Sequence, residues 1–357
     1  QQIARAMAHQ SLLDKEKTFA EYEFGLDVRL TKAVAKLGFV HPTLVQAQCI
    51  PLAMEGRDLL VRARTGSGKT AAYCLPLIHR VLESKLKASR KRKGVRGLIL
   101  CPTRELVSQT MDQVQHLLQY CRDVLSACAL SAESLAVQAA RLAEQPDIVI
   151  ATPGQAARHL GSGALSLKLV QVLVIDEADM VLAYGSGDDV RAVVQQLPDA
   201  RQCLLMSATL SEDLQGLKRI VLRKPAVVKL EEGSTDGVLS QFCVDVRQRD
   251  KELLLFALIR LDMIRGKTLF FVNSIDRCYH FKLLLERFSI NAAVLNAELP
   301  MNSRRHIIEQ FNKGVFDYLI ATDESLAVAA PVRRASSAEK VEKAVPKEAV
   351  AEEADVE

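Results

Sequence analysis

Short apolar runs that each end in polar residues recur along the chain. They predict buried strands at 59–61, 97–101, 147–151, 172–175 and 203–206, and apolar residues at helical spacing lie between them. Strands that alternate with helices favour an open parallel sheet. In such a sheet the ligand crevice lies at the carboxyl ends of the strands, so the polar residues that follow each run are candidates for a site.

A second alternating pattern follows the polar, glycine-containing stretch 231–240. It predicts helices at 251–261, 275–288 and 303–312, and strands at 268–272, 292–295 and 318–321. We therefore predict an α/β chain with an N-terminal extension (1–18), a first domain (19–232), a linker (233–240), a partial second domain (241–325) and a tail (326–357). The tail is rich in Ala, Val, Glu and Lys and has no aromatic residue, so we expect it to be disordered.

Composition places the chain among globular proteins and says less about its partners. The net charge of +4 is compatible with nucleic acid binding but is not evidence for it. The 8 cysteines are scattered singly, which favours free thiols over structural zinc or disulfides. No apolar stretch is long enough to span a bilayer and no signal-type segment opens the chain, so we expect an intracellular protein with neither a membrane partner nor a structural metal.

The run Thr65-Gly66-Ser67-Gly68-Lys69-Thr70 lies between the first predicted strand and a helix. Its glycines let the backbone turn tightly and bring several N–H groups to an anion, and the helix N-terminus adds its positive end. In this P-loop, Lys69 would reach the β- and γ-phosphates, and the Thr70 hydroxyl would hold Mg²⁺. The general pattern begins with Gly where this chain has Ala63, and a chance glycine turn in a surface loop is the competing interpretation.

Paired acids at the end of the strand 172–175 support the P-loop interpretation. Asp176 stands where a P-loop nucleotide hydrolase holds Mg²⁺. Its neighbour Glu177 can position the attacking water and help to remove its proton. Paired acids also occur as simple helix N-terminal charges worth about 0.3 to 1 kcal/mol, but the P-loop upstream favours the catalytic interpretation.

Other polar residues occupy similar corners between a strand and a helix. Thr103 and Arg104 begin a helix, where a hydroxyl and backbone N–H groups can bind one phosphate of a nucleic acid, although a helix cap is the alternative. Gln46 carries both a donor and an acceptor, which suits an adenine edge, but alone it is more simply an ordinary polar helix residue. The basic run 85–96 is more simply a solvated loop than a contact for RNA phosphates.

Taken in order, these motifs resemble the motif series of the DEAD-box RNA helicases. The matching segments are 63–70, 102–106, 152–154, 176–179 and 207–209, and the residues of 38–46 resemble the Q motif of that family. In the second domain, the segments 266–268, 271–279 and 298–312 resemble the nucleolar subgroup that assists large ribosomal subunit assembly. The resemblance implies two RecA-like parallel-sheet domains in tandem, the second incomplete, which use ATP and Mg²⁺.

The resemblance also implies a role for individual residues. Adenine would be read by Gln46 with an aromatic ring stacked nearby, either Phe19 or Tyr22. The metal would be held by Thr70 and Asp176, the water by Glu177, and the nucleotide state would be coupled to RNA through Ser207 and Thr209. The triphosphate would be bound by Thr65, Gly66, Ser67, Gly68, Lys69 and Thr70. The RNA sugar-phosphate backbone would be contacted by Thr103, Arg104, Thr152, Gly154 and Thr322.

The subgroup implies pre-rRNA and pre-ribosomal particles as partners, and the nucleus and nucleolus as location. Two departures are Gln155, where many members carry Arg, and Met301, where Gln is common. After the segment 320–323, the later motifs of the family do not follow, and these supply an arginine finger worth about 10³ to 10⁵ in rate in related phosphoryl transfer.

We therefore expect the chain to bind ATP but to be a poor helicase. A sequence cut short inside an insertion is the leading explanation, and a natural short product is the alternative. The rival function is a non-catalytic assembly factor in which nucleotide gates RNA binding. A P-loop hydrolase that acts on protein or small molecules has little support, because the segments 102–106 and 207–209 have no evident role in it.

Overall fold

The computed structural model describes residues 13–14, 16–87, 93–131, 133–209, 212–230 and 240–322. The chain divides into two compact units, Gln1–Phe242 and Cys243–Glu357. The tail predicted at 326–357, the linker up to residue 239 and the first twelve residues of the N-terminal extension lie outside the described residues.

The described part of the first unit contains a 7-stranded sheet in the order β3-β4-β2-β5-β6-β1-β7, and all of its pairings are parallel. Its strands are β1 (Leu59–Arg62), β2 (Gly97–Leu100), β3 (Ala127–Leu130), β4 (Ile148–Ala151), β5 (Val172–Ile175), β6 (Gln202–Ser207) and β7 (Ala226–Lys229). The predicted strands are confirmed with small shifts at their ends. The edge strands β3 and β7 were not predicted.

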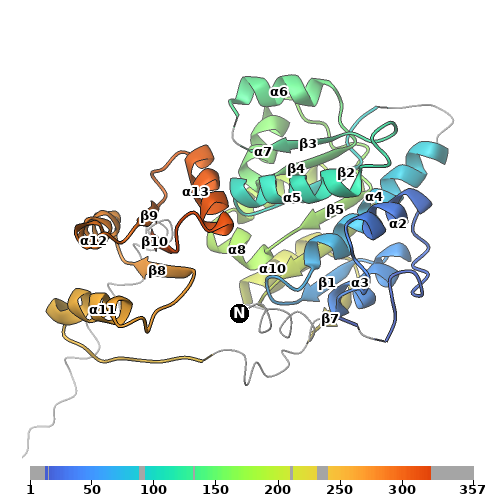
Figure 1. Ribbon diagram of the computed structural model, residues 1–357. Coiled ribbons are helices and arrows are strands. Elements are labelled where there is room, and N and C mark those ends of the chain that lie inside the picture. Colours follow the sequence, from blue (N-terminus) through green and yellow to red (C-terminus); the bar gives the residue numbers. More distant parts are fainter. Residues whose placement is uncertain are drawn as a thin grey trace, which may run out of the picture. The chain divides into compact units, whose positions relative to one another are not determined.

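Helices cover both faces of this sheet, as Figure 1 shows. One face packs against α2 (Val28–Lys36), α3 (Leu44–Met54), α4 (Lys69–Lys87) and α5 (Arg104–Leu117). The other packs against α6 (Leu135–Ala143), α7 (Pro153–Gly161), α8 (Ala178–Ala183), α9 (Gly187–Gln195) and α10 (Glu212–Val221). Alternate strand residues enter opposite cores: Leu59 and Val61 pack on the α3 and α4 side, and Leu60 on the other. Because both faces are buried, the interior strands β2, β4 and β5 are continuously apolar.

The second unit is built on a smaller parallel sheet. In its described residues the strand order is β8-β10-β9, with β8 (Thr268–Val272), β9 (Ala292–Leu295) and β10 (Tyr318–Thr322). Its helices are α11 (Lys251–Arg260), α12 (Ile275–Arg287) and α13 (Met301–Lys313), preceded by the 3₁₀ turn η1 (Gln248–Asp250). Its core gathers around Phe281 and Leu285 of α12.

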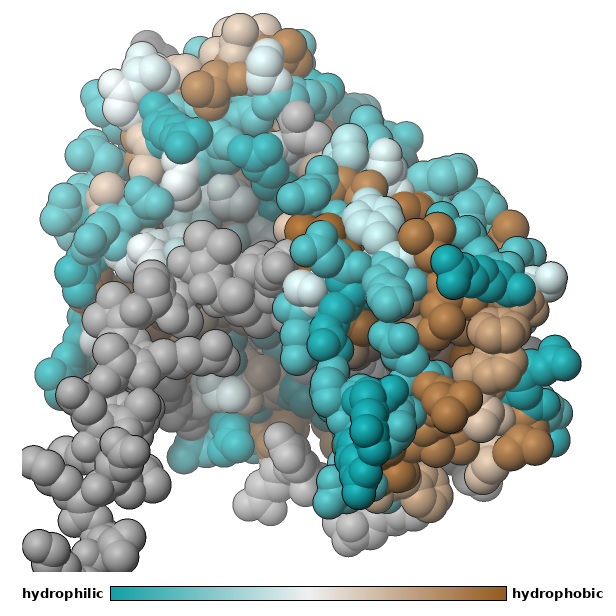
Figure 2. Space-filling view, turned by 90° about the vertical axis from the view of Figure 1, so that its left-hand side faces the viewer, coloured by the Kyte–Doolittle hydropathy of each residue, from teal (hydrophilic) through white to brown (hydrophobic). Residues whose placement is uncertain are grey.

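Large apolar side chains remain exposed on this second unit. Leu253, Phe271 and Leu283 are 68%, 65% and 59% exposed. Figure 2 shows apolar residues (brown) in patches between polar ones (teal) on the face turned to the viewer. The described residues of the second unit therefore bury a much smaller apolar core than those of the first.

Candidate active site

The P-loop lies at the carboxyl end of β1, between that strand and α4. The Ala63 N–H donates to the Ser207 carbonyl oxygen at 3.1 Å, so the ladder between β1 and β6 continues into the loop. Gly66 and Gly68 have φ values of +81° and +92°. A Cβ at Gly68 would lie 2.7 Å from Gln46 Nε2, so both the backbone conformation and the space require glycine there.

Lys69 joins the P-loop to the acidic pair after β5. Its side chain is 5% exposed, its ammonium donates to the Ala63 carbonyl oxygen at 2.8 Å, and Nζ lies 3.1 Å from Glu177 Oε1. The Thr65 hydroxyl donates to the same carboxylate oxygen at 3.3 Å. The structure thus brings together two motifs that the sequence predicts to act together but that are more than a hundred residues apart.

Glu177 sits on a sharp turn between β5 and α8. Its φ of 45° and ψ of 55° lie in the left-handed region, which is uncommon for a residue with a side chain. The Glu177 N–H donates to Asp176 Oδ1 at 3.0 Å. Backbone strain of this kind costs of order 1 to 3 kcal/mol and persists where the surrounding packing imposes it. The turn aims the Glu177 carboxylate at Lys69.

Asp176 accepts a hydrogen bond from a residue that lies outside the sequence motifs. Tyr73 of α4 is fully buried, and its phenol donates to Asp176 Oδ2 at 2.9 Å. Burial raises the pKa of Asp176 to about 6, and the hydrogen bond from Tyr73 opposes that rise. The sequence could have pointed to Tyr73 through its spacing. Tyr73 lies four residues after Lys69, and therefore one turn along the same helix face.

The residues of this site fit a phosphate with a hard divalent cation. Ser67 Oγ in the P-loop and Ser207 Oγ at the end of β6 are buried hydroxyl oxygens that have no hydrogen-bond partner in the described part of the chain. Thr70 follows Lys69 in the first turn of α4. A hydroxyl and a carboxylate supply the oxygen ligands that Mg²⁺ prefers, while Lys69 and the N-terminus of α4 supply positive charge for an anion.

Gln46 is tied to the P-loop. It is 5% exposed, its Oε1 accepts from the Thr43 N–H at 2.9 Å, and its Nε2 donates to the Gly68 carbonyl oxygen at 3.2 Å. Thr43 and Gln46 form a capping box at the start of α3. The amide oxygen and nitrogen each make one of these bonds, so each keeps one further acceptor or donor position for an adenine edge.

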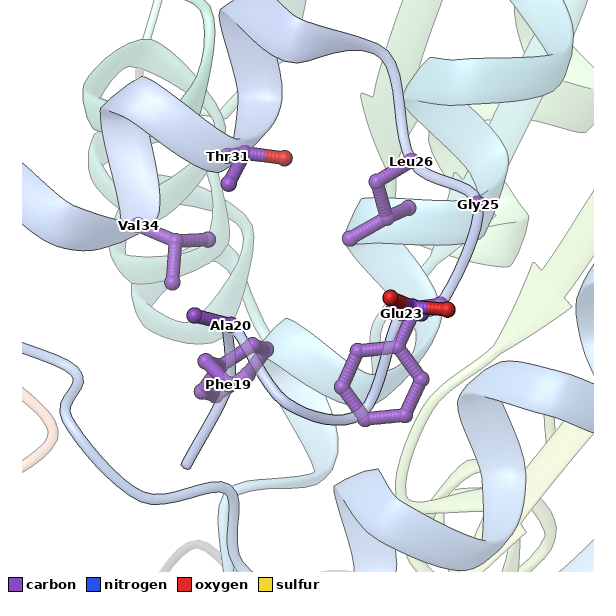
Figure 3. A pocket seen from close by; sticks show the side chains of 8 residues that line it. Phe19, Ala20, Glu23, Gly25, Leu26, Thr31 and Val34 are labelled. Carbon is purple, nitrogen blue, oxygen red and sulfur yellow. The ribbon is translucent and has the colours of Figure 1, made fainter. Parts of the chain in front are cut away.

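The two aromatic candidates for stacking on adenine lie in one cluster before α2. Phe19 meets Phe24 edge to face at 5.4 Å between ring centroids, and Tyr22 stacks on Phe24 at 4.8 Å. A pocket of about 130 Å³ lies between this segment and α2. Figure 3 shows Phe19, Leu26 and Val34 around it. Phe19 lines the pocket and Tyr22 does not, but no P-loop residue lines it either, so the choice between the two rings stays open.

The first-unit candidates for RNA contact lie at the same edge of the sheet. Thr103 caps α5, accepting from the Leu106 N–H at 3.3 Å, and Thr152 caps α7, accepting from the Gln155 N–H at 3.4 Å. Because β2 and β4 are neighbours, these two helix N-termini open side by side. Arg104 in the first turn of α5 is exposed, and Gly154 lies in the first turn of α7. Thr322 ends β10 in the second unit.

The end of β6 is connected to α8 by two hydrogen bonds. The backbone N–H and the hydroxyl of Thr209 both donate to Asp179 Oδ2, at 3.0 and 2.9 Å. Asp179 belongs to the same acidic motif as Asp176 and Glu177. The sequence predicts each residue as part of a motif, but only the structure joins them into a pair.

Two family models match the chain: the DEAD/DEAH box helicase over residues 43–217 and the helicase conserved C-terminal domain over residues 250–324. The chain belongs to the DEAD/DEAH box helicase family. The first match contains the P-loop, the acidic pair and the Thr209–Asp179 link described above. Most of the second described unit lies within the second match.

Relatives with similar sequences carry helicase names. The chain is 47% identical over 317 residues to the protein named probable ATP-dependent RNA helicase ddx56 of Dictyostelium discoideum, covering 88% of this chain and 46% of that protein. It is 44% identical over 311 residues to ATP-dependent RNA helicase dbp9 of Schizosaccharomyces pombe, covering 87% of this chain and 52% of that protein. The chain therefore spans about half the length of these relatives.

Two solved structures share the fold. Saccharomyces cerevisiae Dbp5 bound to RNA and ADP BeF3 superposes with a TM-score of 0.70 at 23% identity, covering 86% of this chain and 76% of that one. A DEAD box protein from Methanococcus jannaschii gives 0.55 at 28% identity, covering 86% and 80%. The expected pair of RecA-like parallel-sheet units is confirmed.

Within the described residues, no helix is long and apolar enough to cross a bilayer. No group of three or more His, Cys, Asp or Glu side chains there is arranged to hold a metal ion.

Proposed function

We propose that this chain is an ATP-dependent RNA helicase of the DEAD-box type that binds and remodels RNA. The observation that carries the proposal is the ion pair between Lys69 and Glu177, at 3.1 Å between side chains that are 5% and 10% exposed. It joins a phosphate-binding loop to a carboxylate suited to activate water. The family match and the helicase names of the relatives support the same activity.

In the proposed mechanism, Lys69 exchanges the Ala63 carbonyl and the Glu177 carboxylate for ATP phosphates. The P-loop N–H groups bind the same phosphates, Ser67 offers its unpartnered hydroxyl, and Gln46 reads adenine. Thr70 and Asp176 would hold Mg²⁺, which would neutralise phosphate charge. Glu177, released from Lys69, orients a water molecule and accepts its proton.

RNA binding is proposed for the helix N-termini at the sheet edge. Thr103, Arg104, Thr152 and Gly154 in the first unit, and Thr322 in the second, would contact the sugar-phosphate backbone without reading sequence. Ser207 and Thr209 lie at the end of β6, beside both the P-loop and α8. They would transmit the nucleotide state to the RNA-binding edge.

We further propose a role in assembly of the large ribosomal subunit, on pre-rRNA and pre-ribosomal particles, in the nucleus and nucleolus. The support is the similarity to relatives named ddx56 and dbp9, together with the second-unit motifs that resemble the nucleolar subgroup. Cross-linking of the tagged chain to RNA in growing cells tests this role. Enrichment of pre-rRNA is expected, and recovery of messenger RNA alone would contradict it.

The first test of the activity is ATP binding and RNA-stimulated ATP hydrolysis by this chain, beside a version extended through the later motifs of the family. We expect both to bind ATP and the extended version to hydrolyse it. Lys69→Ala should abolish binding in both. If neither version hydrolyses ATP while both hold ATP and RNA, the nucleotide-gated assembly factor replaces the helicase.

A further inference from the structure

The phenol of Tyr73 is the feature of this site that neither the motifs nor the proposed mechanism uses. Tyr73 has no exposed surface, and its hydroxyl donates to Asp176 Oδ2 at 2.9 Å. It lies on α4, one turn after Lys69, whereas Asp176 follows β5. We propose that Tyr73 is a positioning residue that fixes the Asp176 carboxylate for Mg²⁺. This inference rests on the proposed nucleotide site.

Two donors from different elements define the plane of the carboxylate. Oδ1 accepts from the Glu177 N–H at 3.0 Å, and Oδ2 accepts from Tyr73. Rotation about the terminal bond of an Asp side chain has a broad, nearly two-fold profile, so one donor leaves the carboxylate free to turn. A second donor on the other oxygen removes that freedom. Each oxygen keeps a further lone pair for the metal or for a water molecule on it.

Tyr73 is itself held in place. Thr110 of α5 is 4% exposed, and its side chain interacts with the phenol. Thr110 Oγ1 also lies 3.6 Å from Cys101 Sγ, at the end of β2. The phenol therefore links α4, which begins at the P-loop, and α5, which follows β2, to the acidic strand end. A buried aromatic ring alone would explain a phenylalanine here, and the hydroxyl is what the positioning role requires.

The test removes only the hydroxyl. Tyr73→Phe keeps the ring in the core. Tyr120→Phe is the control because it makes the same change on a 41% exposed residue that follows the C-terminal end of α5 and whose ring faces Lys36 Nζ at 5.8 Å. Fluorescent ATP is titrated against the full chain in EDTA and then at increasing Mg²⁺. Partners that orient metal ligands typically contribute 10- to 100-fold to metal affinity. We expect Tyr73→Phe to raise the half-saturating Mg²⁺ concentration about tenfold and to leave the affinity for ATP in EDTA unchanged. Tyr120→Phe should keep the wild-type value of both quantities.

A double-mutant cycle decides whether Tyr73 acts through Asp176. In an Asp176→Asn background, Tyr73→Phe should leave the Mg²⁺ dependence unchanged. A further rise of the same size in that background would overturn the proposal, and so would a Tyr73→Phe single variant with the wild-type half-saturation. If the wild-type chain shows no Mg²⁺-dependent ATP binding, the proposed function fails together with this inference. Failure of the inference alone is therefore recognisable.

If Tyr73→Phe does not fold, the hydrogen bond can be measured by fluorine NMR in a chain that keeps the Tyr73 hydroxyl. With 3-fluorotyrosine placed at position 73 alone, the fluorine resonance reports the hydrogen bond to Asp176 directly. Adding Mg²⁺ to the ATP-bound chain should shift that resonance, and Asp176→Asn should abolish the shift. If the chemical shift of that resonance does not change when Mg²⁺ is added, the phenol only fills the core and the proposal is wrong.

Discussion

Replacing Glu177 by Gln tests the ion pair on which the proposed mechanism depends. The substitution keeps the size of the side chain and removes its charge. In the structure the Glu177 carboxylate pairs with Lys69 Nζ at 3.1 Å and accepts from the Thr65 hydroxyl at 3.3 Å. The amide can still accept one hydrogen bond, and Lys69 keeps its bond to the Ala63 carbonyl at 2.8 Å. The change therefore isolates the charge of Glu177.

The magnitude follows from burial. The two side chains are 5% and 10% exposed, and removing one partner of a buried pair costs about 3 to 5 kcal/mol when nothing replaces it. Because the amide still accepts a hydrogen bond, we expect a loss of about 2 to 4 kcal/mol in the free energy of unfolding without nucleotide. ATP phosphates supply the missing negative charge to Lys69. We therefore expect ATP affinity to rise by about 5- to 100-fold, which corresponds to about 1 to 3 kcal/mol.

Three measurements on the same variant check this reasoning. Fluorescent ATP titration gives the affinity, and urea unfolding with and without ATP gives the stability. Single-turnover hydrolysis, measured in the version extended through the later motifs, should fall by about 10² to 10⁴ because the general base is absent. Glu83→Gln is the matched control, since it breaks an exposed pair with Lys87 and should change stability by less than about 1 kcal/mol. Normal hydrolysis by Glu177→Gln would refute the assignment of the base. Weaker ATP binding would refute the exchange of partners by Lys69.

Three further variants probe other parts of the first unit. Asp147→Asn should lower the free energy of unfolding by about 3 kcal/mol in urea without changing ATP affinity, because this 2% exposed carboxylate pairs with two basic side chains. Thr209→Val should preserve ATP binding but weaken the stimulation of hydrolysis by RNA, because it removes one of two donors to Asp179, while Thr209→Ser should behave as wild type. Burial raises the pKa of Asp176 from 3.8 to about 6, so ionising this carboxyl destabilises the folded state. The destabilisation is absent below pH 3.8, where the carboxyl is protonated in both states, and reaches its full size above about pH 6. Asp176→Asn in EDTA should therefore stabilise the chain by about 2 to 3 kcal/mol at pH 8, with the difference shrinking to zero as the pH falls to 4.

Each of these three predictions has a contradicting outcome. If Asp147→Asn has the same free energy of unfolding in urea as the wild type, the ion pairs of Asp147 make no net contribution to stability. RNA stimulation that survives in Thr209→Val would remove the coupling role from its hydroxyl. A stability difference for Asp176→Asn that is constant from pH 4 to pH 8 would show that the effect does not come from ionisation.

Local patterns predicted most of the secondary structure that builds the site. The strands predicted at 172–175, 268–272 and 292–295 match β5, β8 and β9, because continuous apolar runs that end in polar residues leave little choice of state. Edge strand β3 escaped prediction, since its Ala-Cys-Ala-Leu sequence has weak strand propensity and depends on pairing with β4. Asp147 was predicted inside a strand, but β4 begins one residue later, and its carboxylate instead bonds to Lys85 and Ser126.

By itself, the sequence determined which residues could bind phosphate and activate water, because those functions need particular side chains next to particular turns. The tertiary structure alone decided how these residues meet. Strand neighbours far apart in the chain are selected by packing of the whole sheet, which places β6 between β1 and β5 and so brings Glu177 to Lys69. The left-handed turn at Glu177 and the bond from Tyr73 to Asp176 likewise depend on atoms from separate elements, which no local pattern specifies.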